Sequence, residues 1–221
     1  GLPAQPMPEG NDWDRWQGPT AWRPFNHALQ FGWMAWRDYS GGEMTNWGAH
    51  GVDQVQWALG MCQTGPVQIW PITPDASGKV GMRYANGVVV SYELASGPMG
   101  GAIFTGENCK IEINRNKFAT NPPDFVTNPP PAAEAAVWEG AGWIARPHLQ
   151  NWLDSIKTRQ LPSADVEIGH RSISVCHLAN IARLLGRRLR WNPDAEQFVD
   201  DAEANTYLNR PRRKGYELPE V

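Results

Sequence analysis

The dipeptide Asn86-Gly87 constrains the fold more than any other feature of the chain. It separates two runs that are rich in apolar and β-branched residues, Lys79 to Ala85 and Val88 to Leu94. A two-residue hairpin turn needs positive φ at its central residues, and asparagine followed by glycine adopts this conformation most readily. The sequence therefore predicts a tight antiparallel hairpin in the middle of the chain.

Three further segments extend this hairpin to a sheet. Val67 to Trp70 is a short apolar run, and a turn-forming Gly-Glu-Asn segment separates Ala102 to Thr105 from Lys110 to Asn114. In the last of these, Ile111 and Ile113 alternate with polar residues, which is the period of a strand with one buried face. We therefore expect a largely antiparallel sheet of at least four strands.

Helices dominate the sequence after the proline-rich segment Asn121 to Pro131, which predicts a long loop. His148 to Arg159 carries apolar residues at helical spacing, and Val166 to Leu185 ends at Gly186, a typical helix stop. Strands followed by helices are typical of an α+β fold. We expect an open-faced sheet with helices packed on one face, and a homo-oligomer that forms through the open face.

Residues 1–40 are predicted to form an extended arm, rich in proline and tryptophan, ahead of a single α+β domain from 41 to 221. The chain has 12 tryptophans, and those among the early prolines are expected to staple the arm to a core. Trp33, Trp36 and Arg37 lie closer to the domain. They fit either the same packing or the rim of a ligand site.

The segment from Gly41 to Gly60 carries the residues that indicate a functional site. If it forms a helix, four side chains fall in one polar stripe: Asn46, His50, Asp53 and Trp57. Such a stripe suits the wall of a pocket, but His50 and Asp53 could also be a surface pair that contributes only about 0.2–0.5 kcal/mol. The glycines on either side of His50 favour a site, because a bare backbone lets a ligand or another domain approach closely.

Charge and hydropathy exclude several classes of function. The formal net charge is -3 and the basic residues occur only in short local clusters, so no nucleic-acid surface is expected. No apolar run approaches the ~18 residues that a membrane span requires. We therefore expect a soluble protein without membrane or nucleic-acid partners. It would reside in the cytoplasm or the periplasm, and the sequence leaves this choice open.

No metal or cofactor site is predicted on the chain itself. The three cysteines lack the CxxC spacing of a zinc or redox motif. Gly140 to Ala145 fits the letters of a dinucleotide-binding fingerprint, but no strand precedes it and Pro147 interrupts the helix that should follow. We therefore expect no nucleotide to bind to this chain alone.

Several separated blocks of sequence together resemble a known family. In chain order they read GGEMTNWGAHGVD, IFTGENCKIEINRNKF, ADVEIGHRSISVCHLANIARLLGRRLRW and EANTYLNRPRRKGYEL. They are similar to the C-terminal domain of the Gfo/Idh/MocA oxidoreductases, the family of glucose-fructose oxidoreductase and inositol dehydrogenase. The resemblance implies a two-domain enzyme in which a Rossmann domain, absent from this chain, binds NAD or NADP and carries an active-site lysine.

The resemblance also implies roles for the stripe residues. His50 would be the catalytic acid and base as hydride moves between a sugar or polyol carbon and nicotinamide, and Asn46 would hold a neighbouring hydroxyl. Relatives commonly have aspartate at the position of Asn46, and an amide cannot exchange a proton. Asp53 would orient His50 or tie the helix down. The candidates for substrate binding are Trp33, Trp36, Arg37, Asp53 and Trp57.

Three interpretations of function stay open at this point. The first is the substrate-binding domain of an NAD(P)-dependent oxidoreductase, inactive without its nucleotide-binding domain. The second is a carbohydrate-binding or oligomerisation module without catalysis, for which the amide at Asn46 is an argument. The third is a glycosidase or lyase that works through an oxidised sugar, as some relatives do.

Overall fold

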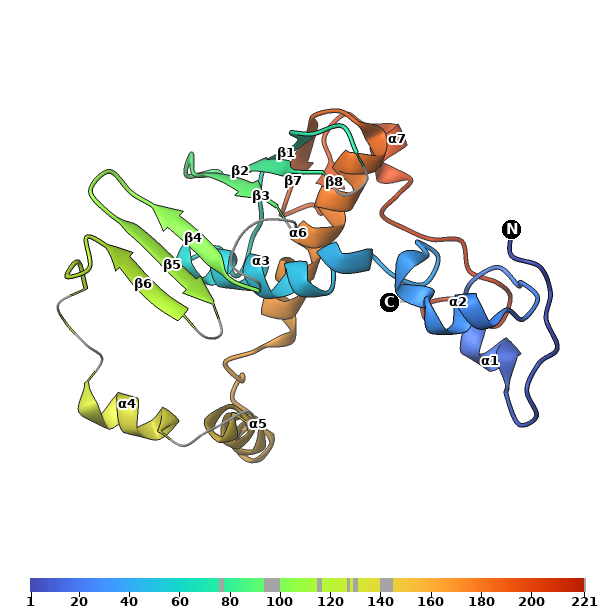
Figure 1. Cartoon of the computed structure of the whole chain (residues 1–221), viewed down its shortest axis with the longest axis horizontal. Helices are drawn as coiled ribbons and strands as arrows, with labels where there is room; N and C mark the ends of the chain where they lie inside the picture. The colour runs from blue at the N-terminus through green and yellow to red at the C-terminus, as the bar shows by residue number, and fades with distance from the viewer. Residues whose placement is uncertain are drawn as a thin grey trace.

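The computed structural model describes residues 1–75, 78–93, 100–114, 117–126, 128, 131–139 and 145–220. Within these ranges the chain forms helices and two antiparallel sheets (Figure 1). The α+β fold predicted from the order of strands and helices is confirmed. Of the segments considered above, Leu94, parts of the proline-rich loop and Gly140 to Ile144 lie outside the described residues.

The larger sheet has five strands in the order β3-β2-β1-β7-β8. Their bounds are Gln68–Pro71 (β1), Val80–Arg83 (β2), Val89–Tyr92 (β3), Leu189–Asn192 (β7) and Gln197–Phe198 (β8). The hairpin between β2 and β3 is confirmed, but its loop has three residues, 85–87, where a two-residue turn was predicted: the Tyr84 N–H donates to the Val88 carbonyl at 2.9 Å, and the Gly87 N–H donates to the Tyr84 carbonyl at 3.0 Å. Gly87 has a φ of 88°, whereas Asn86 does not have the positive φ of the predicted turn. The Asn-Gly turn thus sets the register of this part of the sheet.

The second sheet contains β4 (Ala102–Thr105), β5 (Lys110–Asn114) and β6 (Lys117–Asn121) in that order. β4 and β5 have the predicted bounds, whereas β6 was not predicted because only one large apolar residue interrupts its polar sequence. β4 pairs with β5, while β3 is an edge strand of the larger sheet. The predicted strands are therefore divided between two sheets.

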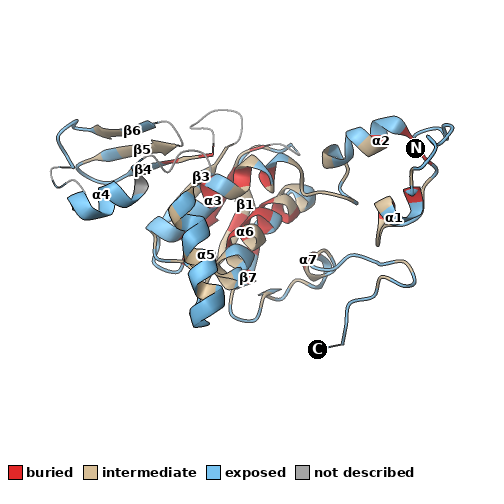
Figure 2. Cartoon of the chain, turned by 90° about the horizontal axis from the view of Figure 1, so that it is seen from below, coloured by how far each residue is buried: buried red, intermediate tan, exposed pale blue. Residues whose placement is uncertain are grey.

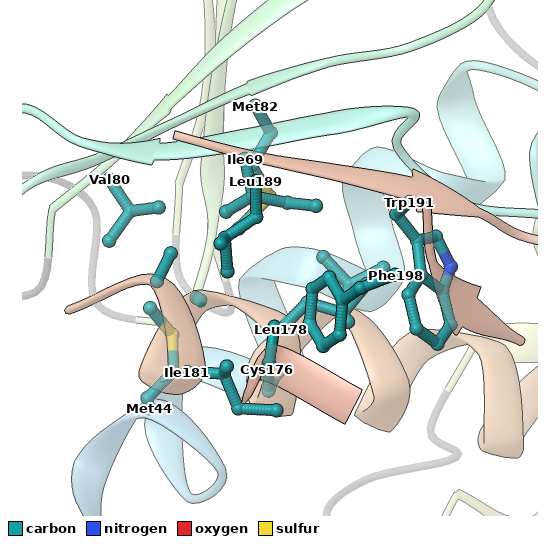
Figure 3. Packing of buried hydrophobic residues seen from close by; sticks show 14 of the residues in the cluster. Met44, Ile69, Val80, Met82, Cys176, Leu178, Ile181, Leu189, Trp191 and Phe198 are labelled. Carbon is teal, nitrogen blue, oxygen red and sulfur yellow. The ribbon is translucent and has the colours of Figure 1, made fainter. Parts of the chain in front are cut away.

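The main core lies between the five-stranded sheet and α6 (Val166–Leu185), on which α3 (Trp47–Ala58) packs in turn. α6 has the predicted bounds: Asp165 accepts a hydrogen bond from the Glu167 N–H at 2.9 Å, and Gly186 follows the helix with a φ of 64°. Figure 3 shows buried apolar side chains that fill this core, among them Ile69, Val80, Met82, Leu178, Ile181, Leu189, Trp191 and Phe198. Helices thus cover one face of this sheet, as predicted.

Three more helices are α4 (Ala132–Trp138), α5 (Arg146–Thr158) and α7 (Ala202–Asn205). α5 corresponds to the helix predicted from His148 to Arg159, whereas α4 was not predicted. In Figure 2 the buried residues gather in α3, α6 and β1, while α5 is largely exposed. No helix within the described ranges is long and apolar enough to cross a membrane.

The N-terminal segment contains short helices where an extended arm was expected. They are α1 (Trp13–Gln17), α2 (His27–Phe31) and η1 (Trp33–Ala35), and η2 (Gly42–Met44) follows them. The cause is local capping: the Asp12 and Asn26 side chains accept backbone N–H groups at the starts of α1 and α2. The arm has a small core of its own and lies to one side of the domain (Figure 1). The division into arm and domain stays a prediction.

Candidate functional site

The polar stripe lies on α3 and its N-terminal cap. Asn46 occupies the N-cap position, so the helix begins later than predicted and η2 replaces its first turn. His50, Asp53 and Trp57 follow along one exposed side of α3, and the Trp57 side chain is 77% exposed. All four residues of the stripe are thus exposed, and their arrangement as one continuous surface stays a prediction.

The apolar side of α3 faces α6 and the core. Val52 is buried, while Val55 and Leu59 are half-buried. Gln56 is buried as well, and its amide donates to the carbonyls of Met61 at 2.9 Å and Thr64 at 2.8 Å. These bonds fix the segment that follows α3, a role that the apolar periodicity did not indicate.

His50 lies where the approach to the second sheet meets α3. Its ring is 5.6 Å from that of Trp47, measured between centroids. A Cβ atom on Gly100 would lie 3.4 Å from the Cβ of His50, and the Gly100 carbonyl accepts a hydrogen bond from Gln54 Nε2 at 2.8 Å. Gly100 thus lies beside His50, where a larger residue would contact the histidine, and the His50 side chain is exposed.

Asp53 ties α3 to α6. Its Oδ1 accepts a hydrogen bond from Ser172 Oγ at 2.7 Å, and Ser172 is buried on α6. Asn46 makes a local contact, since its Nδ2 donates to Glu43 Oε2 at 3.3 Å. Of the two roles considered for Asp53, the bond to Ser172 corresponds to fixing the helix.

The two glycines of α3 admit a neighbouring strand rather than a ligand. A Cβ atom on Gly51 would lie 2.9 Å from the Gly101 carbonyl oxygen and 3.0 Å from Tyr92 Oη. The hydroxyl of Tyr92 also donates to the Gly48 carbonyl. A close approach occurs at these glycines, as expected. The groups that approach are Tyr92 of β3 and Gly101, which directly precedes β4.

The three candidates of the arm have separate surroundings. The guanidinium of Arg37 lies 4.8 Å from the ring centroid of Tyr207, and Trp36 lies under Arg23 at 5.6 Å, against the small core of the arm. Trp33 lines an open hollow of about 230 Å³ together with Trp16 and Tyr39. Trp36 thus packs in the arm, Arg37 is exposed beside Tyr207, and Trp33 lies at a surface hollow.

The ionisable groups behind the stripe belong to the core. Burial raises the pKa of the Cys176 thiol to about 12, so this thiol is protonated at neutral pH. Burial also raises the pKa of Tyr92, which keeps its hydroxyl available as a hydrogen-bond donor to Gly48. No group of three or more His, Cys, Asp or Glu side chains in the described part of the chain could hold a metal ion.

Sequence reasoning missed Ser172 and Tyr39, and it assigned Trp16 only to packing. Ser172 is 119 residues from Asp53, so no local pattern could have linked them. Tyr39 is close to Trp33 in sequence but Trp16 is not, and the abundance of aromatic residues was the available signal. That signal does not show how the arm folds, and it is this fold that turns the three rings toward one hollow.

The fold and the site together define the class of this protein. It is an α+β domain with antiparallel sheets and one polar helix face. Residues 1–218 match the model of an oxidoreductase family, described as its C-terminal α/β domain. The chain therefore belongs to the Gfo/Idh/MocA oxidoreductase family. The match includes the arm and the C-terminal tail as well as the two sheets. A comparison with curated proteins found no match.

Proposed function

We propose that this chain is the substrate-binding domain of an NAD(P)-dependent sugar or polyol oxidoreductase. The observation that carries the proposal is the exposed stripe of Asn46, His50, Asp53 and Trp57, in a chain that belongs to an oxidoreductase family. The stripe offers an imidazole, an amide and an indole on one surface, which are groups that recognise hydroxyls and the apolar faces of sugar rings.

His50 is the acid and base in this proposal. Histidine is the side chain suited to proton exchange near neutral pH, so His50 accepts the proton of the reacting hydroxyl and returns it in the reverse reaction. The amide of Asn46, one helical turn away, hydrogen-bonds a neighbouring hydroxyl and fixes the ring. Asp53, held by Ser172, keeps α3 in place on α6.

The nicotinamide is assigned to a separate Rossmann domain. When bound, NAD or NADP supplies the acceptor for the hydride that leaves the substrate carbon. The residues of this chain position the substrate and carry its proton. Asp53 and Gln54 fix the geometry of this surface through their bonds to Ser172 and Gly100.

The substitution His50→Ala tests the role of the imidazole in the protein that contains both domains. We expect kcat/KM to fall by about 10²–10⁴-fold, the usual contribution of a positioned acid or base, while the Kd for the nucleotide stays unchanged. His148→Ala, at an exposed histidine of α5, is the matched control and should retain full turnover. Turnover that survives His50→Ala would remove the imidazole from the reaction.

A non-catalytic carbohydrate-binding module is the second candidate, favoured by the amide at Asn46 and its pairing with Glu43. Incubation of the two-domain protein with neutral sugars and polyols and with NAD or NADP distinguishes the candidates. Net reduction of the nucleotide supports the oxidoreductase, and sugar binding without any product supports the module. Cleavage of a glycoside without net change of the nucleotide would instead indicate a redox-assisted glycosidase or lyase.

A further inference from the structure

The hollow on the arm has walls of aromatic rings. It is lined by Trp16, Trp33 and Tyr39 and has a volume of about 230 Å³. Trp33 is 45% exposed, which is high for a side chain of its size. Drug-sized ligands fill pockets of roughly 300–1,000 Å³, so this hollow suits a single ring.

The walls are held rigidly from behind. Trp16 stacks on Trp13 with ring centroids 4.5 Å apart, and Trp13 is buried with its Nε1 donating to the Arg23 carbonyl at 2.8 Å. The ring of Tyr39 lies 5.2 Å from that of Trp16. Ligand binding would therefore not need to order these two rings, which lowers the entropic cost of binding.

The lining selects a neutral ligand that has a flat apolar face and polar edges. No charged side chain lines the hollow within the described residues. Tyr39 Oη is buried, so the Tyr39 ring presents its face rather than its hydroxyl to the hollow, which suits stacking on the apolar face of a ligand ring. Aromatic faces supply large contact areas, and indole and phenol groups add hydrogen-bond donors at the edges.

We infer that this hollow is a stacking subsite for a neutral sugar ring, distinct from the ring that His50 would engage. The inference rests on the proposed function for its class of ligand, but binding here does not need the imidazole. The subsite also joins the stripe through the chain: η1 carries Trp33 and lies beside η2, which leads directly to Asn46.

Saturation-transfer NMR on the whole chain tests the subsite, with methyl β-D-glucopyranoside and cellobiose as probes. We expect transfer to the C–H protons of the ring, and we expect Trp33→Ala to raise the Kd at least fivefold while Trp33→Phe retains binding. Trp22→Ala is the matched control, because Trp22 lies in the same arm and is 62% exposed but does not line the hollow. The control should bind as the wild type does.

Three results would overturn the inference. These are the absence of transfer to either sugar, a Kd that does not change in Trp33→Ala, and binding of phenol that depends on Trp33 while neither sugar binds. Failure of the inference and failure of the proposed function are distinguishable. Sugar binding that depends on Trp33 and persists in the His50→Ala variant would uphold a subsite separate from the imidazole. The same binding in a wild-type two-domain protein without oxidoreductase turnover would uphold the subsite and overturn the proposed function alone.

Discussion

At the scale of single residues, Gly51 shows how one missing side chain positions the second sheet. A Cβ atom there would meet the Gly101 carbonyl oxygen and Tyr92 Oη at 3.0 Å or less, and neither neighbour is the end of a flexible chain. We expect Gly51→Ala to lower the free energy of unfolding, because overpacking costs about 1–3 kcal/mol and exceeds the gain in helix propensity of up to ~1 kcal/mol.

Urea unfolding measures this effect, and Gly169→Ala on α6 is its control. A Cβ atom on Gly169 would have no neighbour within 4 Å, so alanine there should stabilise the chain by about 0.4–1 kcal/mol. If both variants were stabilised alike, the contact between α3, Tyr92 and the start of β4 would not constrain the chain.

The candidate site was predictable where it depends on spacing along one helix. The intervals of four, three and four residues predict that Asn46, His50, Asp53 and Trp57 avoid the apolar side of the helix, and all four are exposed. The spacing carries no information on what the helix packs against. The bond from Ser172 to Asp53 is therefore a product of the tertiary fold.

At the scale of elements, the C-terminal tail clamps the arm. Arg213 donates from Nε to the Gly18 carbonyl at 2.6 Å and pairs with Asp14, and its backbone N–H donates to the Pro19 carbonyl at 3.0 Å. Its side chain is only 20% exposed. One residue of the tail thus holds α1 and the turn that follows it.

We expect Arg213→Ala to loosen the arm without unfolding the domain. Limited proteolysis with mass spectrometry should show cleavage within residues 1–40 at a rate at least threefold higher, because local opening exposes the backbone of the arm. Arg212→Ala, at the exposed neighbouring arginine, is the control and should leave the rate unchanged. Equal rates in the two variants would show that the clamp contributes nothing to the order of the arm.

Elements with strong local signals were predictable from the sequence, and short elements were not. α6 has a capping aspartate and a glycine stop, and β5 has a clear alternation of isoleucines, so both were found with their observed bounds. α1 and α2 have five residues each, which is too short to show a helical period. β8 has two residues, and it exists because it pairs with β7.

At the scale of the whole molecule, the two sheets differ in how their outer faces are covered. On the larger sheet, the Trp70 ring lies over Gly81 and the Arg188 guanidinium covers it at 4.0 Å. On the smaller sheet, Ile113 and Phe118 lie opposite each other on one face, and Phe118 is 59% exposed. The apolar face of the smaller sheet is therefore the better candidate for the self-association predicted from the sequence.

Sedimentation velocity on this chain and two matched variants tests this assignment. We propose that a second copy covers this face, so the wild-type chain should sediment as a dimer or larger species, and Phe118→Glu should shift it to the monomer because a buried carboxylate without a partner is costly. The control is Ile103→Glu, at a residue 45% exposed on the opposite face, beside Glu112. It should leave the association unchanged. A wild-type monomer at micromolar concentration, or equal dissociation in both variants, would mean that this face does not join copies of the chain.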